Sequence, residues 1–140
     1  MEQAAAIRDE ESVTAGTAQT SCLRTSFQAR KLTRNFLATV SPPPSSEAAE
    51  TVLLVVSELV TNALRHGRGI RDFRLTARHD SVTVEVGDST SALPQDRSPR
   101  DFAEGEGGGF GWPIVCHLAR DVTIRPTPDH GKIICADIPL

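Results

Sequence analysis

The sequence contains few cysteines, and their spacing excludes two kinds of site. The three are Cys22, Cys116 and Cys135, and no two of them form a Cys-x-x-Cys pair. A zinc site built on paired cysteines is therefore excluded. Three cysteines in 140 residues are also too few for a fold that depends on disulfides. Each cysteine lies in an apolar stretch, so we expect buried, reduced thiols, which are typical of a cytoplasmic protein.

The sequence also lacks a long apolar segment and an excess of positive charge. Its longest uncharged, mostly apolar stretch, residues 51–57, is too short to span a bilayer, and the N-terminus has no basic or apolar region of a signal peptide. Lysine and arginine total 15 against 18 acidic residues, for a net charge of -3. Direct nucleic-acid binding is disfavoured because it requires a broad basic surface. We therefore expect a cytoplasmic protein that contacts neither nucleic acid nor membrane.

The remaining composition favours one compact domain. Hydrophobic residues make up 39% of the chain and charged residues 24%, which is enough apolar material for a core. Residues 1–20 mix small polar and acidic side chains without any period, and we expect a flexible tail there. Residues 21–140 are expected to form the single domain.

Two segments with apolar residues at helical spacing predict helices. The first covers residues 27–37 and must end before the three prolines at 42–44. The second is longer. It begins with Ser45 or Ser46 as the N-cap, and Gly67 is a natural C-terminal stop. Because this helix is apolar around most of its circumference, we expect it to pack against a sheet.

After Gly67 the hydrophobic period changes to two, which predicts strands. Residues 73–77 and 82–86 would form a hairpin with one buried face. The other expected elements are a short edge strand at 21–25, a long lid-like loop at 89–108, a helix at 111–119 and strands at 122–125 and 132–138. This order predicts an α+β fold, a two-layer sandwich in which helices cover one face of a mixed, mostly antiparallel sheet.

The long helix carries a polar stripe within an apolar segment. Glu58, Asn62 and His66 are spaced four residues apart, so they share one helical face. The simpler interpretation is a solvent-exposed face, which is ordinary for a surface helix. The functional interpretation is a carboxylate general base, Glu58, beside an oxygen ligand, Asn62, for a hard cation such as Mg²⁺.

Asp88 ends the second strand of the predicted hairpin. An aspartate at this position often only caps a turn. Its functional interpretation is an acceptor for the exocyclic amino group of a base, which would favour adenine over guanine.

Glycines gather directly before the helix expected at 111–119. The segment reads Gly107, Gly108, Gly109, Phe110, Gly111 and Trp112. Glycine lets the backbone approach a ligand closely, and a helix N-terminus attracts phosphate. A flexible hinge is the alternative interpretation. The segment is neither a Rossmann motif, since it does not open a βαβ unit, nor a Walker A loop, since no Gly-Lys-Ser/Thr follows.

The order of these signals resembles the ATP-binding fold shared by gyrase, histidine kinases and mismatch-repair ATPases. Within it, residues 56–67 are similar to the bacterial anti-sigma factor serine kinases, and the resemblance covers about residues 22–138. It implies that Glu58 is the general base, that Asn62 ligates Mg²⁺ and that Asp88 binds the adenine amino group. Gly109, Gly111 and the neighbouring amides would wrap the phosphates, and His66 would line the same pocket.

The resemblance also implies ATP and Mg²⁺ as cofactors and proteins as partners. The expected function is phosphorylation of Ser or Thr of an anti-anti-sigma antagonist, together with sequestration of a sigma factor, and homodimers are typical of the family. Three features depart from the family pattern: Ser89 follows Asp88, Ile133 stands where a threonine is common, and Trp112-Pro113 opens the helix after the glycines. These departures predict weakened ATP affinity.

Two other functions remain open. One is a non-catalytic ATP-binding interaction module that regulates transcription by binding partners. The other is the ATPase domain of a histidine kinase, which is disfavoured because no dimerisation and phosphoacceptor helix pair precedes the domain.

Overall fold

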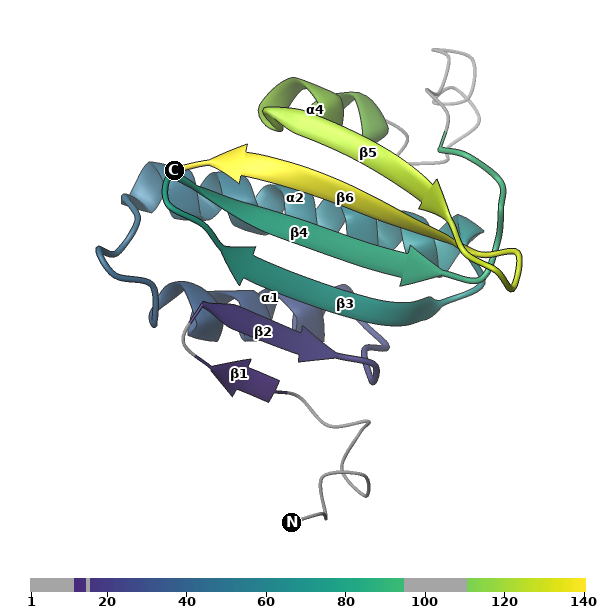
Figure 1. Ribbon diagram of the computed structural model, residues 1–140, viewed down its shortest axis with the longest axis horizontal. Coiled ribbons are helices and arrows are strands. Elements are labelled where there is room, and N and C mark those ends of the chain that lie inside the picture. Colours follow the sequence, from purple (N-terminus) through teal and green to yellow (C-terminus); the bar gives the residue numbers. More distant parts are fainter. Residues whose placement is uncertain (1–11, 15, 95–110) are drawn as a thin grey trace.

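The computed structural model describes residues 12–14, 16–94 and 111–140. Within these ranges, six strands form one sheet in the order β1-β2-β3-β4-β6-β5, and three helices cover one of its faces (Figure 1). The strands are β1 (Ser12–Thr14), β2 (Thr17–Thr20), β3 (Ile70–Ala77), β4 (Ser81–Asp88), β5 (Asp121–Pro126) and β6 (Lys132–Pro139), and the helices are α1 (Ser26–Leu37), α2 (Ser46–His66) and α4 (Gly111–Leu118).

Helix α2 forms because its sequence supplies an N-terminal cap and a continuous apolar side. The Ser45 hydroxyl accepts a hydrogen bond from the backbone N–H of Ala48 at 3.1 Å, and Glu47 places negative charge in the first turn. The buried residues of the helix are Val52, Leu53, Val55, Val56, Leu59, Val60 and Ala63. Gly67 is the C-cap, so the helix ends at His66.

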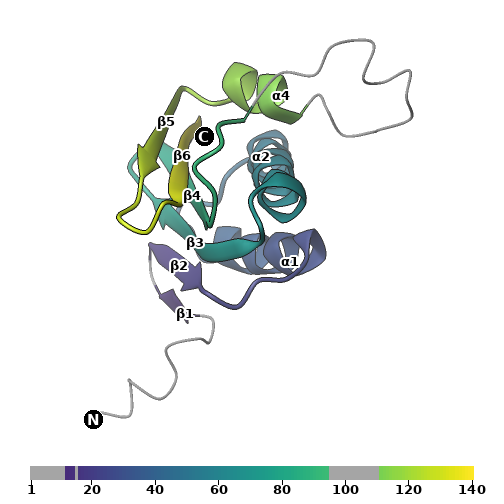
Figure 2. The same ribbon diagram turned by 90° about the vertical axis from the view of Figure 1, so that its right-hand side faces the viewer.

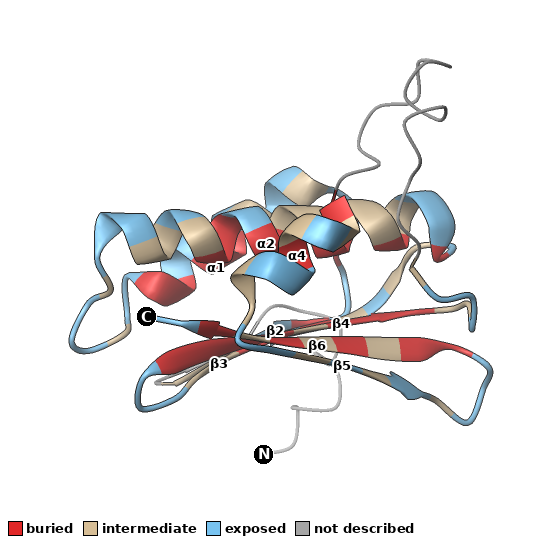
Figure 3. Cartoon of the chain, turned by 90° about the horizontal axis from the view of Figure 1, so that it is seen from above, coloured by how far each residue is buried: buried red, intermediate tan, exposed pale blue. Residues whose placement is uncertain are grey.

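The sheet turns an apolar face toward the helices. Along β6, the buried residues Ile134, Ala136 and Ile138 alternate with partly exposed ones. Figure 3 shows the two layers, with buried residues where helices and sheet meet. In Figure 2, α1 lies over the β2 and β3 side of the sheet, α4 over the β6 and β5 side, and α2 between them. Helix α2 therefore packs on the middle of the sheet and contacts both α1 and α4 (Figure 2).

The predicted α+β two-layer fold is confirmed, and both helices of the N-terminal half and the hairpin form where expected. Every pairing between the described strands is antiparallel, whereas a mixed sheet was expected. In the described part of the chain, none of the helices is both long enough and apolar enough to cross a membrane.

The N-terminal expectations need correction. Residues 12–14 and 17–20, assigned to a flexible tail, form β1 and β2, because β2 pairs with the edge of β3. The strand expected at 21–25 is wrong. Thr25 is instead the N-cap of α1, where its hydroxyl accepts a hydrogen bond from the Gln28 backbone at 3.1 Å and its own N–H donates to Gln28 Oε1 at 3.2 Å.

The expectation of buried thiols is also wrong. Cys22 and Cys116 are exposed and Cys135 is partly exposed. Cys135 is one of the residues of β6 that alternate with the buried ones, so it does not belong to the apolar face that packs on the helices.

Candidate functional site

The polar stripe of α2 lies at the margin of the core. Glu58 and Asn62 are partly exposed and His66 is exposed, while Leu59 and Ala63 beside them are buried. Burial raises the pKa of Glu58 above its ordinary value, and the positive charge of Arg65 opposes this shift. Glu58 is therefore not an ordinary solvent-facing carboxylate, and a raised pKa makes it a stronger base than a carboxylate in water.

Glu58 is in close contact with Gly111, the first residue of α4. A Cβ atom on Gly111 would overlap Oε1 of Glu58, so only glycine fits at this position without a shift of the carboxylate. The N–H groups of a first helical turn have no partner within their own helix and form its positive end. The fold thus brings the stripe of α2 to a helix terminus that favours anions.

Asp88 lies at the C-terminal end of α2, against its C-cap Gly67. It is the last residue of β4 and is 3% exposed. A Cβ atom on Gly67 would overlap Oδ2 of Asp88, and the backbone N–H of Ser89 donates to the Gly67 carbonyl at 3.0 Å. The Oδ1 atom accepts a hydrogen bond from the backbone N–H of Thr90 at 3.1 Å. The end of α2 and the end of β4 are therefore fixed against each other around this carboxylate.

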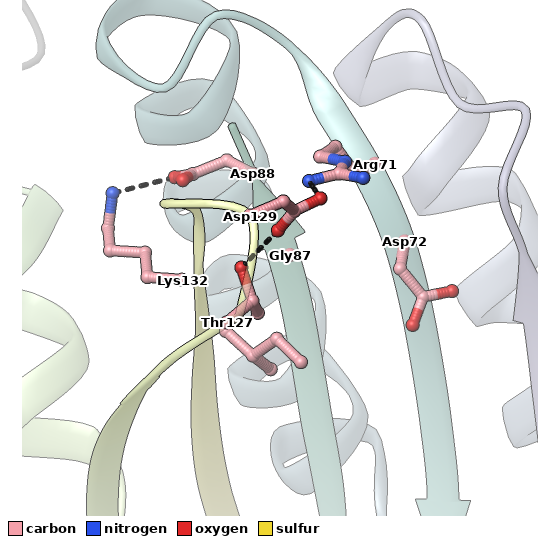
Figure 4. A pocket seen from close by; sticks show the side chains of 8 residues that line it. Arg71, Asp72, Gly87, Asp88, Thr127, Asp129 and Lys132 are labelled. Carbon is pink, nitrogen blue, oxygen red and sulfur yellow. Dashed lines mark hydrogen bonds and ion pairs between the residues drawn. The ribbon is translucent and has the colours of Figure 1, made fainter. Parts of the chain in front are cut away.

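Lys132 holds the second oxygen of Asp88. Its Nζ atom lies 2.8 Å from Oδ2 of Asp88 and 3.4 Å from the Thr90 carbonyl (Figure 4). The two side chains form a buried ion pair, with 5% of Lys132 and 3% of Asp88 exposed. Lys132 is not among the site residues predicted from the sequence. The signal that could have found it is the antiparallel register of β4 with β6, which sets Asp88 opposite Lys132.

A cavity of about 240 Å³ lies beside this ion pair. It is lined by Arg71, Asp72, Gly87, Asp88, Thr127, Asp129, Lys132 and Ile133 (Figure 4). Asp129 is engaged, because it forms an ion pair with Arg71 and accepts a hydrogen bond from the Thr127 hydroxyl at 2.7 Å. Burial raises the pKa of Asp72. The cavity therefore has three carboxylate side chains in its lining, and two of them, Asp88 and Asp129, are already paired with Lys132 and Arg71.

The predicted site residues divide into three groups. The structure brings Glu58 to Gly111 and Asp88 to the C-terminal end of the helix that carries Glu58, Asn62 and His66. Trp112 is partly buried and packs against the hydrophobic core. The residues predicted to wrap phosphate, 107–110, lie outside the described residues, as does most of the expected lid at 89–108. Among the residues that are described, no group of three or more His, Cys, Asp or Glu side chains is placed to hold a metal ion.

Comparison with known proteins gives relatives over most of the chain. The profile of the histidine kinase-like ATPase domain family matches residues 23–137. The anti-sigma F factor of Pasteuria penetrans is 30% identical over 129 residues, which cover 82% of this chain and 83% of that protein.

Two solved structures share the fold. One is a chain of the SiaB-SiaC complex from Pseudomonas aeruginosa, with a TM-score of 0.55 and 12% identity over 99% of this chain and 95% of that chain. The other is the histidine kinase domain of the Erythrobacter litoralis EL346 blue-light activated histidine kinase. Its TM-score is 0.50, at 21% identity over 92% of this chain and 70% of that chain.

Proposed function

The chain belongs to the histidine kinase-like ATPase domain family, and from this premise we propose that it is an ATP- and Mg²⁺-dependent serine/threonine protein kinase of the anti-sigma factor type. Its proposed substrate is a Ser or Thr hydroxyl of an antagonist protein, and its proposed second partner is a sigma factor. The curated relative, an anti-sigma F factor, supports this choice within the family.

The contact between Glu58 and Gly111 is the observation that carries the proposal. It places a carboxylate with a raised pKa beside the positive end of α4. We propose that Glu58 accepts the proton of the acceptor hydroxyl while the hydroxyl oxygen attacks the terminal phosphorus of ATP. The bond from that phosphorus to the bridging oxygen breaks, and ADP leaves with the electron pair. The N–H groups at the start of α4 would stabilise the phosphate charge.

The distance along α2 from Asp88 to Glu58 matches the length of a nucleotide bound parallel to the helix. Nine positions of the chain separate Glu58 from Gly67, which at 1.5 Å per residue is about 13 Å. This length suits a base at the Asp88 end and a triphosphate at the Glu58 end. Asn62 lies between them and offers an amide oxygen, the type of ligand that Mg²⁺ accepts. Bound Mg²⁺ would neutralise charge on the phosphates, and His66 would line the same channel.

A second candidate function, the non-catalytic interaction module, is favoured by one specific observation. Asp88, the residue proposed to bind the base, is already engaged by Lys132. A base subsite occupied by a lysine fits a domain that binds ATP weakly, does not transfer phosphate and regulates its partners by binding them.

Two substitutions on α2 separate these functions. Glu58→Gln removes the base and leaves the proposed phosphate and metal contacts, so phosphate transfer should fall about 10²- to 10⁴-fold while ATP-Mg²⁺ binding is retained. Asn62→Ala removes the proposed metal ligand, so Mg²⁺-dependent ATP binding and transfer should fall together. Glu50→Gln, on an exposed position of the same helix, is the matched control and should change neither.

The measurements are calorimetric ATP binding with and without Mg²⁺ and transfer of labelled phosphate to an antagonist protein that forms a complex with the chain. Binding of ATP-Mg²⁺ without transfer to any such antagonist would reject the kinase and leave the binding module. No change in Glu58→Gln and Asn62→Ala relative to Glu50→Gln would reject the site.

A further inference from the structure

The Asp88–Lys132 ion pair lies where a nucleotide base is proposed to bind. We propose that Lys132 controls access of the base to Asp88, so that an adenine amino group reaches this carboxylate only by displacing the lysine ammonium. This inference rests on the proposed binding of ATP. It assigns to Lys132 a role in setting ATP affinity and base selectivity. The resemblance to anti-sigma factor kinases did not indicate this residue.

Both oxygens of the Asp88 carboxylate are already used within the protein. Oδ2 accepts from Lys132 Nζ at 2.8 Å and Oδ1 accepts from the Thr90 N–H at 3.1 Å. Gly67 packs against the same carboxylate on the side of α2. With 3% of Asp88 exposed, a base cannot reach either oxygen while these neighbours stay in place. Among the contacting groups, Lys132 is the one whose contact with Asp88 is made by a long side chain rather than by backbone.

The side chain of Lys132 can move away from Asp88. Its ammonium sits on a four-carbon stem with several rotatable bonds, and Lys132 also lines the cavity of about 240 Å³ beside the pair. A displaced ammonium keeps a nearby acceptor in the Thr90 carbonyl, which lies 3.4 Å from Nζ, whereas Asp129 is already paired with Arg71 and Asp72 lies beside Gly87 on the opposite face of the sheet.

Displacement makes adenine binding weaker than the carboxylate alone would allow. The incoming amino group is a neutral donor, and it replaces a charged donor in a buried site, where charged hydrogen bonds are the stronger ones. The lysine has a different effect on guanine. Guanine presents a carbonyl oxygen at the corresponding position, which a bare carboxylate repels but to which an ammonium can donate. The wild-type site should therefore distinguish the two purines poorly.

The test measures affinities for ATP-Mg²⁺ and GTP-Mg²⁺ by calorimetry in four full-length proteins. Lys132→Thr removes the ammonium and leaves a small hydroxyl, while Lys132→Gln keeps a neutral donor for Asp88. Lys31→Thr, at an exposed position of α1, makes the same chemical change away from the site. The fourth protein is the wild type. Circular dichroism melting identifies any variant that has lost its fold, and Lys132→Gln serves if Lys132→Thr does not fold.

We expect Lys132→Thr to bind ATP about ten- to a hundredfold more tightly than wild type, the range that corresponds to one charged hydrogen bond. GTP affinity should stay level or fall, so the ratio between the purines rises. Lys132→Gln should be intermediate and Lys31→Thr unchanged. If wild type binds ATP and folded Lys132 variants bind it no better, the inference is overturned while the proposed function stands. If none of the four proteins binds either nucleotide, the proposed function fails and this inference fails with it.

Discussion

Gly111 and Glu58 are in such close contact that a single added methyl group on the glycine would overlap the carboxylate. The same relationship recurs at the C-terminal end of α2, where Gly67 packs against Asp88. Each of the two carboxylates at the proposed site is thus in close contact with a glycine from another part of the sequence. The two glycines fix where the carboxylates lie, and they can be tested without removing a catalytic group.

Gly111→Ala should reduce phosphate transfer without unfolding the protein. The atom that the new Cβ would meet is the end of a flexible side chain, so Glu58 can rotate away at little cost. Alanine is favoured over glycine in helices, and stability should stay within about 1 kcal/mol of wild type. Transfer should fall by about 10²-fold or more because the base is misplaced. Urea unfolding and the transfer assay measure the two effects.

The matched control for this substitution is Gly87→Ala. Gly87 is also buried near the site, but a Cβ atom there would meet nothing closer than 3.5 Å, which is ordinary contact. It should alter neither stability nor transfer appreciably. If Gly111→Ala retains full transfer, the contact with Glu58 has no role in the reaction.

Gly67→Ala should act on stability instead. Its Cβ would overlap Oδ2 of Asp88 and would also lie 2.7 Å from Asp88 Cβ, so rotation of the carboxylate alone does not relieve the clash. Asp88 must move away from Lys132, and separating a buried ion pair costs about 3–5 kcal/mol. We expect a loss of unfolding free energy of that order in urea, against almost none for Gly87→Ala. An unchanged urea midpoint would show that Asp88 can move without losing Lys132.

The parts of the fold with a strong local signal were predictable from sequence. Helix α2 combines an N-cap at Ser45 with a long apolar side, and the hairpin of β3 and β4 alternates with period two. Strand β2 has no such signal, because Thr17–Thr20 is short and polar and becomes a strand only by pairing with β3. Thr25, predicted to end a short strand, is instead a helix cap, and a β-branched residue is compatible with both positions.

The arrangement of the proposed site was predictable where its residues share one element. Helical spacing alone places Glu58, Asn62 and His66 on one face of α2. Lys132 does not, because it meets Asp88 across 44 positions of sequence and only the register of β4 with β6 sets them opposite each other. Likewise, the contact of Gly111 with Glu58 depends on how α4 packs on α2, which no local pattern encodes.

Arg120→Ala should lower stability in a pH-dependent way. Arg120 donates from Nη1 and Nη2 to Asp80 at 3.2 Å each and from Nε to Asp137 at 2.9 Å, so it joins the turn between β3 and β4 to β6. Its hydrogen bonds hold the pKa of Asp80 below the ordinary value. A lowered native pKa contributes stability above the ordinary carboxyl pKa, and that contribution is lost as pH falls through the lowered value.

The urea midpoints of wild type and Arg120→Ala should therefore differ at pH 7 and converge in strong acid. Arg125→Ala is the control, because Arg125 pairs with Glu85 at a longer 3.6 Å and both partners remain partly exposed. It should shift the midpoint less at neutral pH. A gap for Arg120→Ala that persists unchanged into acid would mean that its contribution is packing rather than charge.

The pH dependence of transfer should follow Glu58 and should respond to Arg65. A general base must be deprotonated, and burial raises the pKa of Glu58, so transfer should rise with pH through that raised value. Arg65 is a cation that lowers the same pKa. Arg65→Ala should therefore move the acidic limb of the kcat/KM profile to higher pH, while Arg34→Ala, an exposed position on α1, should leave it in place.

The raised pKa of Glu58 also predicts that Glu58→Gln, which loses transfer, gains stability at high pH. Because the native pKa of Glu58 is raised, its contribution to stability is present below the ordinary carboxyl pKa and is lost as pH rises through the raised value. Glu58→Gln should thus be more stable than wild type at pH 8 and gain little at pH 4, although it loses transfer at both. Measuring urea midpoints at the two pH values tests this. A variant that gains equally at both would indicate that Glu58 is not strained by burial, and its role as a tuned base would lose its physical support.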